Sequence, residues 1–360
     1  MAYPLVMKIL AAAIVTVSIA VSNATWGQTP SVPRVIEIWH GGTQRVGHLG
    51  DSQNDFNLMG HIAEWKELDG LHYGINGKAV TPLAFRAYRR LVNDGDFNAD
   101  IPIGALRMGD NTILIQATFR DGARIEKRVQ LIREAGMTQN LPLRIRWSEL
   151  KHLTDAGQAV DGKWEIGPQG LRTAEVGYDR VFLIGNRDWR DYEVQTNVTI
   201  HRVMPKTTLL SGGNGIGLIL RFTGHVTGGP RYFGSGQPKW GYQPFGAIGW
   251  IRWDRGEGEK RSFAQYYPGD NDRGENEMPY PVQEGETYGM RFSCKSLADS
   301  SSGDGVTLYQ YRVWNIRDPE PDAWSWERTQ KSRNALRAGG VALVAHHIDA
   351  SFGDVLVQAK

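Results

Sequence analysis

The chain contains a single cysteine, Cys294, among its 360 residues. A lone cysteine cannot form an internal disulfide, so stability must come from a buried core, with or without a bound metal. The sequence also lacks a Cys/His cluster with zinc spacing, a glycine-rich phosphate loop between a strand and a helix, and a Gly-x-Ser-x-Gly elbow. No reaction can therefore be named from a catalytic motif.

The chain also lacks an excess of either positive or negative charge. The 41 Lys and Arg residues nearly balance the 39 Asp and Glu residues, for a formal charge of +2, and both signs are interspersed. A protein that binds phosphate backbones normally carries a basic stripe. The composition therefore argues against a nucleic-acid partner.

Only one long apolar run is present, from Ile9 to Val21. A membrane-spanning helix needs about 20 such residues, and this run is shorter. Lys8 precedes it, and the small residues at Ser22–Ala24 follow it, which predicts a signal peptide over residues 1–24. An uncleaved anchor is the alternative. The prediction implies a secreted or periplasmic protein with no membrane span after cleavage.

Glycine and tryptophan are abundant, with 43 and 12 residues. This composition favours a turn-rich β protein with some exposed aromatics over a helical bundle. Given the usual length of single domains, the chain is long enough to form two. We therefore expect an all-β protein with two domains.

The first block spans residues 34–133. Its turn signals are spaced as in a β-sandwich, and Leu71–Ile75 followed by Asn76-Gly77 predicts a hairpin. Asp94–Asn98 and Gly109–Ile113 (GDNTI) resemble the later strands of bacterial immunoglobulin-like or cadherin-like domains. That resemblance implies an immunoglobulin-like sandwich that acts as a spacer or docking module.

The second block spans residues 140–360 and holds ten or more predicted strands, which need two sheets. Tyr192–His201 alternates without a break between apolar and polar residues, as a strand with one buried and one wet face does. Only Asp322–Arg337 has room for a helix or a long loop.

Three motifs of this block resemble the concanavalin A-like, laminin-G-like jelly-roll superfamily. They are Asp188–Val194 (DWRDYEV), Gly215–Phe222 (GIGLILRF) and the ending Gly339–Val357, in which Gly353-Asp354 stands where the superfamily often has Asp-Asn. The resemblance implies a jelly-roll sandwich whose concave sheet meets a carbohydrate, in lectin-like modules and in glycan-cleaving enzymes alike.

We expect several of the predicted strands to line one face of the sandwich. The candidates for the sugar-binding surface are polar and aromatic residues of these strands and of one loop. Sugar rings stack on aromatic rings, and Arg and Gln bind hydroxyls or carboxylates. The candidates are Gln195, Asn197, His201, Arg221, Trp240, Trp250, Arg252, Gln265 and Tyr267. Core packing for the tryptophans and a solvated surface for the Arg and His residues are the alternatives. If Trp250 binds sugar, Trp250→Ala should weaken binding with little change in melting temperature.

Oxygen ligands gather between residues 270 and 277 as in a calcium loop. Asp270, Asp272 and Glu275 are the candidate ligands of a structural Ca²⁺, and a plain acidic turn is the alternative.

The sequence thus predicts an exported protein that binds a polysaccharide or other glycan. A glycan-cleaving enzyme using the same groove is the first alternative. A hydrolase would need two carboxylates, and the Glu-x-Asp-x-x-Glu motif of jelly-roll glucanases is absent. Lyases of this fold use His and Tyr with Arg or Gln, and His201, Tyr267, Arg221 and Gln265 are of those types. An extracellular scaffold is the second alternative, and the oligomeric state stays open.

Overall fold

The computed structural model describes residues 33–136, 139–204, 213–227, 237–239, 241–254, 261–271, 273–298 and 304–360. The signal peptide predicted over residues 1–24 lies outside this part of the chain. In the described residues the helical structure consists of short 3-10 turns: η1 (Trp65–Glu67), η2 (Ile103–Ala105), η3 (Trp147–Glu149) and η4 (Leu153–Asp155). None of them is long enough to cross a bilayer. The all-β prediction is confirmed.

Two sheets form an N-terminal sandwich. The smaller sheet has the order β1 (Ile36–Ile38), β3 (Asp55–Ile62) and β6 (Asp96–Pro102). The larger has the order β2 (Thr43–Val46), β8 (Arg124–Arg133), β7 (Gly109–Phe119), β4 (Leu68–Ile75) and β5 (Thr81–Pro82). Leu58 and Phe97 from one sheet meet Ile113 and Ile115 from the other in a fully buried core. The immunoglobulin-like character of this sandwich stays a prediction.

The predicted turn at Asn76-Gly77 follows β4. Both residues have positive φ, 52° and 76°, which is the backbone that a two-residue hairpin turn needs and that Asn and Gly tolerate best. The returning strand is the short β5, in which Thr81 pairs with Tyr73.

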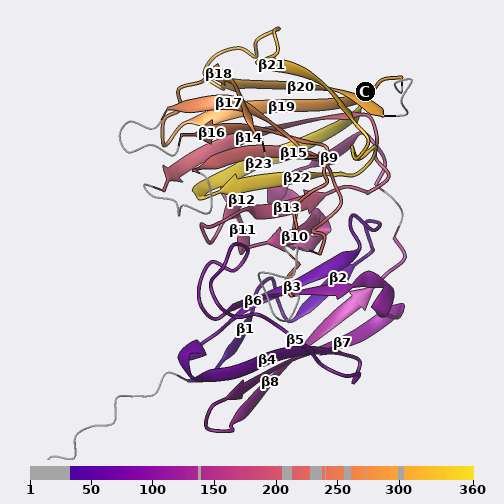
Figure 1. Ribbon diagram of the computed structural model, residues 1–360, viewed down its shortest axis with the longest axis vertical. Helices are drawn as coiled ribbons and strands as arrows, with labels where there is room; N and C mark the ends of the chain where they lie inside the picture. Colours follow the sequence, from indigo (N-terminus) through magenta and orange to yellow (C-terminus); the bar gives the residue numbers. More distant parts are fainter. Residues whose placement is uncertain are drawn as a thin grey trace, which may run out of the picture. The chain divides into compact units, whose positions relative to one another are not determined.

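The C-terminal sandwich also has two sheets, whose strands Figure 1 labels. The seven-stranded sheet has the order β10 (Gly157–Asp161), β13 (Arg180–Ile184), β22 (Gly340–His346), β15 (Gly215–Phe222), β16 (Ala247–Trp253), β17 (Ser262–Pro268) and β18 (Glu275–Pro279). The eight-stranded sheet has the order β11 (Trp164–Gly167), β12 (Gly170–Thr173), β23 (Ile348–Ala359), β14 (Tyr192–Val203), β19 (Thr287–Ser296), β20 (Gly305–Asn315) and β21 (Trp326–Ser332), with β9 (Leu143–Ile145) paired to β23.

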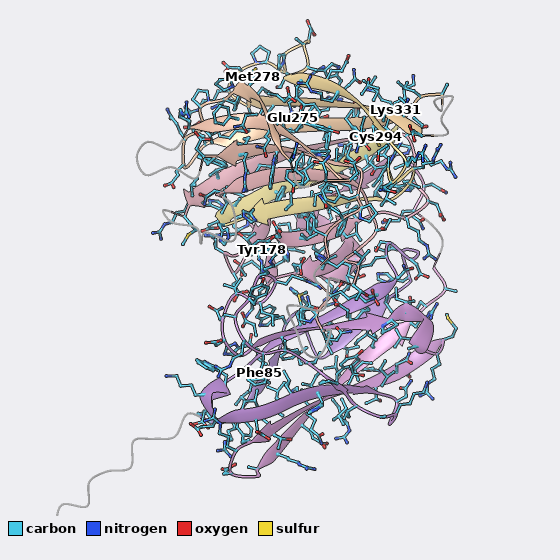
Figure 2. All side chains as sticks on the ribbon, viewed as in Figure 1. Phe85, Tyr178, Glu275, Met278, Cys294 and Lys331 are labelled. Carbon is cyan, nitrogen blue, oxygen red and sulfur yellow. The ribbon has the colours of Figure 1, made fainter. Side chains whose placement is uncertain are left out.

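The strands of the two sheets show two different burial patterns. In β14 the residues from Tyr192 to Ile200 at even positions are buried, and most of those between them are not, as the alternation predicts. In β15 all eight residues are buried, so this strand is covered on both faces. Cys294 lies on β19, buried in the core between the sheets (Figure 2), and burial raises the pKa of its thiol.

The segment Asp322–Arg337 contains a strand, β21, so the expectation of a helix or long loop is wrong. β21 pairs with β20 at the edge of its sheet and buries only Trp326 and Gln330. An edge strand with so few inward residues carries too weak a period-two signal to be recognised from sequence.

Candidate functional site

The predicted site residues that the structure describes fall on two different sheets. Gln195, Asn197 and His201 lie on β14 of the eight-stranded sheet. The others lie on β15, β16 and β17 of the seven-stranded sheet: Arg221, Trp250, Arg252, Gln265 and Tyr267. The expectation of one shared face is wrong, because alternation along a strand assigns a face but not a sheet.

The three β14 residues lie on the outside of the eight-stranded sheet, where charged side chains surround them. Gln195 Oε1 accepts a hydrogen bond of 2.9 Å from Arg291, which also pairs with Glu320 at 2.7 Å. His201 hydrogen-bonds a serine hydroxyl of β23 at 2.8 Å, and burial lowers its pKa. Asn197 is exposed. This surface is a solvated network of ion pairs.

Arg221 is fully buried and connects segments inside the sandwich. Its guanidinium donates to the hydroxyls of Thr307 and Ser296 at 2.9 Å, to the Leu336 carbonyl at 3.0 Å, and to Asp191 at 3.2 Å. A buried charge that satisfies so many partners holds the fold together, and it presents no surface to a ligand.

Trp250 lies on the face of the seven-stranded sheet that is turned away from the core between the two sheets, here called the outer face. Its ring lies against β15 at Gly215, where an added Cβ would be 2.7 Å from the ring, and a Cβ on Gly217 would be 2.4 Å from the Trp250 Cβ and 2.3 Å from the Gly249 carbonyl oxygen. Gly215 therefore makes room for the Trp250 ring, and Gly217 makes room for the start of its side chain and for the backbone of β16. The Trp250 ring reaches to within 6.3 Å of the His346 ring on β22.

The Trp250 ring is 5% exposed and belongs to a buried cluster. The structure therefore predicts that Trp250→Ala lowers the melting temperature, and not that it leaves it unchanged. Truncating a buried Trp costs about 3–5 kcal/mol of folding free energy. Trp250 Nε1 donates to Gln265 Oε1 at 2.7 Å, and Gln265 donates to Asn276 at 2.6 Å. Arg252 covers the ring at 4.7 Å, and Tyr267 meets it edge-on at 6.2 Å. Arg252 and Tyr267 are partly exposed.

A His–Asp pair lies beside this group. His346 Nδ1 is 2.6 Å from Asp179 Oδ1, and the Tyr178 ring is 5.0 Å from that of His346. His347 follows at a ring distance of 4.6 Å. Figure 2 labels Tyr178, which precedes β13. The structure thus brings two histidines, a tyrosine and a carboxylate to the outer face.

Burial and pairing set the protonation of this cluster. Burial alone would raise the pKa of Asp179, but the His346 ring outweighs it and the net shift is downward. Burial, together with the His346 charge, lowers the pKa of His347 to about 4. Asp179 and His347 also have positive φ, 40° and 55°, a strained backbone for these residues that is typical of functional sites.

Sequence reasoning did not identify this cluster. Asp179 and His346 are 167 residues apart, and no motif gives either residue a role. The one signal in the sequence was the histidine pair His346-His347, which directly follows the apolar stretch Gly340–Ala345. Only the pairing of β13 with β22 brings the two ends together.

The N-terminal sandwich also contributes to this region. The Arg89 guanidinium lies 5.7 Å from the centroid of the Tyr178 ring and 5.7 Å from that of Tyr88. Arg89 belongs to the segment between β5 and β6 and has a left-handed φ of 49°.

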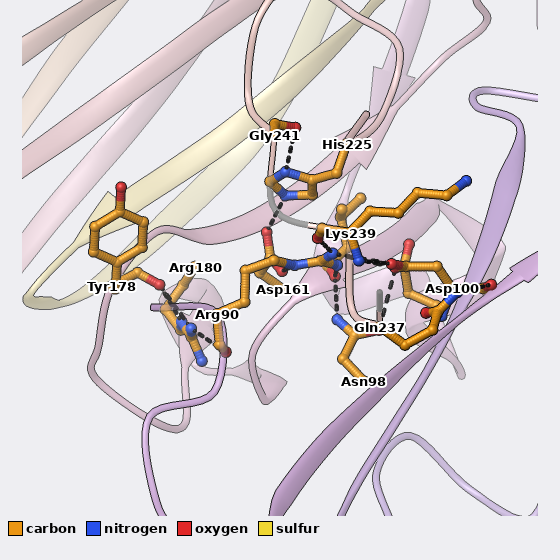
Figure 3. Close-up of polar contacts among 12 residues, drawn as sticks. Arg90, Asn98, Asp100, Asp161, Tyr178, Arg180, His225, Gln237, Lys239 and Gly241 are labelled. Atoms are coloured by element: carbon orange, nitrogen blue, oxygen red, sulfur yellow. Dashed lines mark hydrogen bonds and ion pairs between the residues drawn. The ribbon is translucent and has the colours of Figure 1, made fainter. Parts of the chain in front are cut away.

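A buried network of charges joins the two sandwiches next to Arg89 (Figure 3). Arg90 pairs with Asp161 and, at 3.2 Å, with Asp100. The second oxygen of Asp161 lies 2.6 Å from His225 Nε2. Burial would raise the pKa of Asp161, but Arg90 and His225 outweigh burial and lower it to about 2. All four side chains are at least nine-tenths buried.

The same network fixes parts of the Gly- and Pro-rich stretch between β15 and β16. His225 Nδ1 lies 3.2 Å from the Gly241 carbonyl, and the Lys239 ammonium pairs with Asp55 of the N-terminal sandwich at 2.5 Å. The Lys239 backbone N–H donates to Asp100. Trp240, a predicted sugar contact, lies outside the described residues.

The predicted calcium ligands are only partly described. Glu275 is on strand β18, visible in Figure 2, and pairs with Arg328 at 3.4 Å. Asp270 precedes that strand, and Asp272 lies outside the described residues. Among the residues that the structure describes, no group of three His, Cys, Asp or Glu side chains is placed to hold a metal ion.

The outer face offers the chemistry of sugar recognition. Aromatic rings stack on the C–H faces of sugars, and Gln and Arg supply hydroxyl partners. The His346–Tyr178 contact has the residue types of the lyase alternative, beside Arg252 in place of Arg221. Asp161 and Asp179 are both engaged by histidines, so the described part of this face presents no open carboxylate pair of the kind a hydrolase uses.

Comparisons with known proteins find only solved structures, at low sequence identity. No family model and no curated protein matches the chain. The solved structures that match include the metal-free lectin I-B4 from Griffonia simplicifolia (9% identity, 59% of this chain and 96% of that one, TM-score 0.33). They also include the exoplasmic/lumenal domain of VIP36 with Ca²⁺ and Man3GlcNAc (11%, 56% and 82%, 0.31). A third is a xylan β-1,4-xylosidase from Bacillus halodurans C-125 (8%, 84% and 70%, 0.33). At these identities and TM-scores the similarity establishes neither the fold nor the function of this chain.

Proposed function

We propose that this protein binds a polysaccharide on the outer face of the seven-stranded sheet. The observation that carries the proposal is the arrangement around Trp250, in which an indole, the Gln265 amide, the Arg252 guanidinium and the Tyr267 ring are adjacent on one face. Flat rings next to bidentate donors are what a sugar needs for stacking and for hydroxyl hydrogen bonds.

The burial pattern supports this location. Tyr267 and Arg252 are partly exposed, whereas Trp250 and Gln265 beneath them are held by hydrogen bonds and packing. A rigid layer that positions two accessible groups loses little conformational entropy when a ligand binds.

The test is a glycan array with the purified protein, followed by affinity electrophoresis in the polysaccharide that binds best. Tyr267→Ala should weaken retention about tenfold, the effect of losing roughly 1.4 kcal/mol of stacking. The control is Trp324→Ala, since Trp324 is also partly exposed but lies by the eight-stranded sheet, 4.2 Å from Arg312 and 5.3 Å from Lys360. Equal loss in both variants, or no binding anywhere on the array, would refute the proposal.

A second candidate function is cleavage of the bound glycan. It is favoured by the His346–Asp179 pair in contact with Tyr178, which offers a base and an acid on the same face. In a β-elimination the base would remove a ring proton while the acid protonates the leaving oxygen, leaving an unsaturated sugar. Incubation with the bound polysaccharide, read by ultraviolet absorbance and by reducing ends, tests it. Turnover that persists in His346→Gln would exclude this assignment.

Export belongs to the proposal as well, through a signal peptide at residues 1–24. Expression of the full chain in a bacterial host should give a mature protein in the periplasm or medium that begins after Ala24. Retention of Met1 in the purified protein would contradict it.

A further inference from the structure

A pocket lies where the two sandwiches meet, between the β2–β3 loop, the linker at Gln139 and the start of β10. It holds about 610 Å³ of space that no atom fills, part of which is its open mouth. It is lined by Gly185, which directly follows β13, whereas the outer-face cluster contains Asp179, just before the same strand. The pocket is therefore a separate site at the other end of β13, independent of the proposed function.

Glycines shape the loop that brings His48 to this pocket. Gly47 and Gly50 both have a φ of 83°, and the Gly50 N–H donates to the Gly47 carbonyl at 2.9 Å. The His48 ring lies against η4 of the C-terminal sandwich, where its Nε2 is 2.7 Å from the Thr154 carbonyl oxygen. A carbonyl oxygen only accepts, so Nε2 carries the proton and Nδ1 of the neutral ring is an acceptor.

Two acceptors at the wall of the pocket are buried and unpaired. Neither His48 Nδ1 nor Gln139 Oε1 has a hydrogen-bond partner among the described residues. The Gln139 backbone is held in place, since its carbonyl accepts from Trp189 Nε1 at 2.9 Å. Leaving a buried acceptor unpaired costs free energy, which a ligand donor would recover. Both atoms are closed to solvent in this conformation, so a ligand reaches them through small rotations of the side chains at the wall.

The charges around the pocket favour a cation. Arg45 is engaged by Glu134 through two hydrogen bonds, of 2.7 and 3.1 Å. Burial lowers the pKa of His40 to about 4, so its ring is neutral at pH 7. The Asp51 carboxylate lines the same pocket, is half-buried, and has no hydrogen bond or ion pair to any residue that the structure describes. One negative charge and two neutral acceptors therefore remain for a ligand.

We propose that this pocket binds a small ligand through a primary ammonium group. An ammonium carries three N–H donors and one positive charge, which match the Gln139 and His48 acceptors and the Asp51 carboxylate. Gln139 lies in the linker, and the other two residues lie in the N-terminal sandwich. A ligand held by all three would fix the linker to that sandwich and stabilise the folded chain.

Matched pairs of small molecules test the ligand class by isothermal titration calorimetry on the purified protein. Each pair differs in the ammonium group: glucosamine and N-acetylglucosamine, putrescine and 1,4-butanediol, and alaninamide and propionamide. We expect at least one ammonium compound to bind about tenfold more tightly than its neutral partner and to raise the melting temperature. The pair that responds shows whether the ligand is an amino sugar, an alkylamine or an amino-acid derivative. Equal binding within every pair, or no binding of any ammonium compound, would overturn the proposal.

Variants test the residues. Asp51→Asn should lose about tenfold in affinity for the ammonium compound, because it removes the charge that pairs with it. The control is Asp69→Asn, which removes the same charge from an exposed position on β4. Gln139→Leu should also weaken binding but leave the melting temperature equal or higher, since it removes a buried acceptor that has no partner.

Three outcomes of the variants would overturn the assignment. The first is full affinity in a folded Asp51→Asn protein, or an equal loss in Asp69→Asn. The second is a Gln139→Leu protein that melts at a lower temperature and binds the ammonium compound as well as the wild type, which would show that water satisfies Oε1. The third is amine binding that is lost in Tyr267→Ala and kept in Asp51→Asn, which would place the amine on the outer face.

Discussion

The two sheets of the C-terminal sandwich present opposite kinds of outward surface. Outside the eight-stranded sheet, Arg291 pairs with Glu193 and Glu320, and these side chains remain partly exposed. Outside the seven-stranded sheet, apolar residues such as Val344 and Ile219 are fully buried, and two His–Asp pairs and the Arg252 guanidinium lie on the same face. One surface is solvated, and the other is mostly buried, with Arg252 and Tyr267 partly exposed on it.

This difference explains why the most regular strand pattern lies on a different sheet from the site that we propose. β14 alternates clearly because water covers one of its faces. β15 and β22 read as almost continuous apolar runs because both of their faces are covered. His346 of the candidate site therefore lies on a strand, β22, in which alternation fails.

The largest loss of stability is expected when the buried charge of Arg90 is removed from the network that joins the two sandwiches. Arg90→Ala leaves Asp161 and Asp100 buried without their common partner. We expect a loss of about 3–5 kcal/mol in the free energy of unfolding, measured by urea denaturation. A loss below about 1 kcal/mol would mean that the network does not hold the sandwiches together.

The pH dependence of stability should show a smaller effect. His347 and His40 both have pKa values lowered to about 4, chiefly by burial. The unfolded chain therefore binds more protons than the folded one between about pH 6.5 and 4, so stability falls as the pH drops through that window. His347→Asn keeps a side chain that tolerates positive φ, and its urea midpoint should fall less than that of the wild type between pH 7 and 5. Identical falls would contradict the assignment.

The smallest effect is expected on the eight-stranded sheet. Glu320 lies 2.7 Å from Arg291 and 2.9 Å from Arg312, in a partly exposed network. Glu320→Gln should cost about 1 kcal/mol or less, because solvent screens the charges and Glu193 still pairs with Arg291. A loss as large as that of Arg90→Ala would remove the distinction between the two surfaces.

Sequence patterns predicted the all-β class and the turn at Asn76-Gly77, because both depend on local alternation and backbone preference. They also identified the glycines at Gly215 and Gly217, but not their purpose, which is to admit the Trp250 ring at Gly215 and the Trp250 Cβ and β16 backbone at Gly217. The His346–Asp179 pair and the contact of Arg89 with Tyr178 depend on strand order and on the junction of the sandwiches. Neither has a local signature, so neither could be predicted.

Hydrogen exchange with and without the bound polysaccharide tests the central claim most directly. We predict slower exchange in peptides covering 173–182, 247–254 and 261–268, which carry the outer face of the seven-stranded sheet. Peptides covering 192–203, 287–296 and 305–315 of the eight-stranded sheet should be unchanged. Protection confined to the eight-stranded sheet would contradict the account.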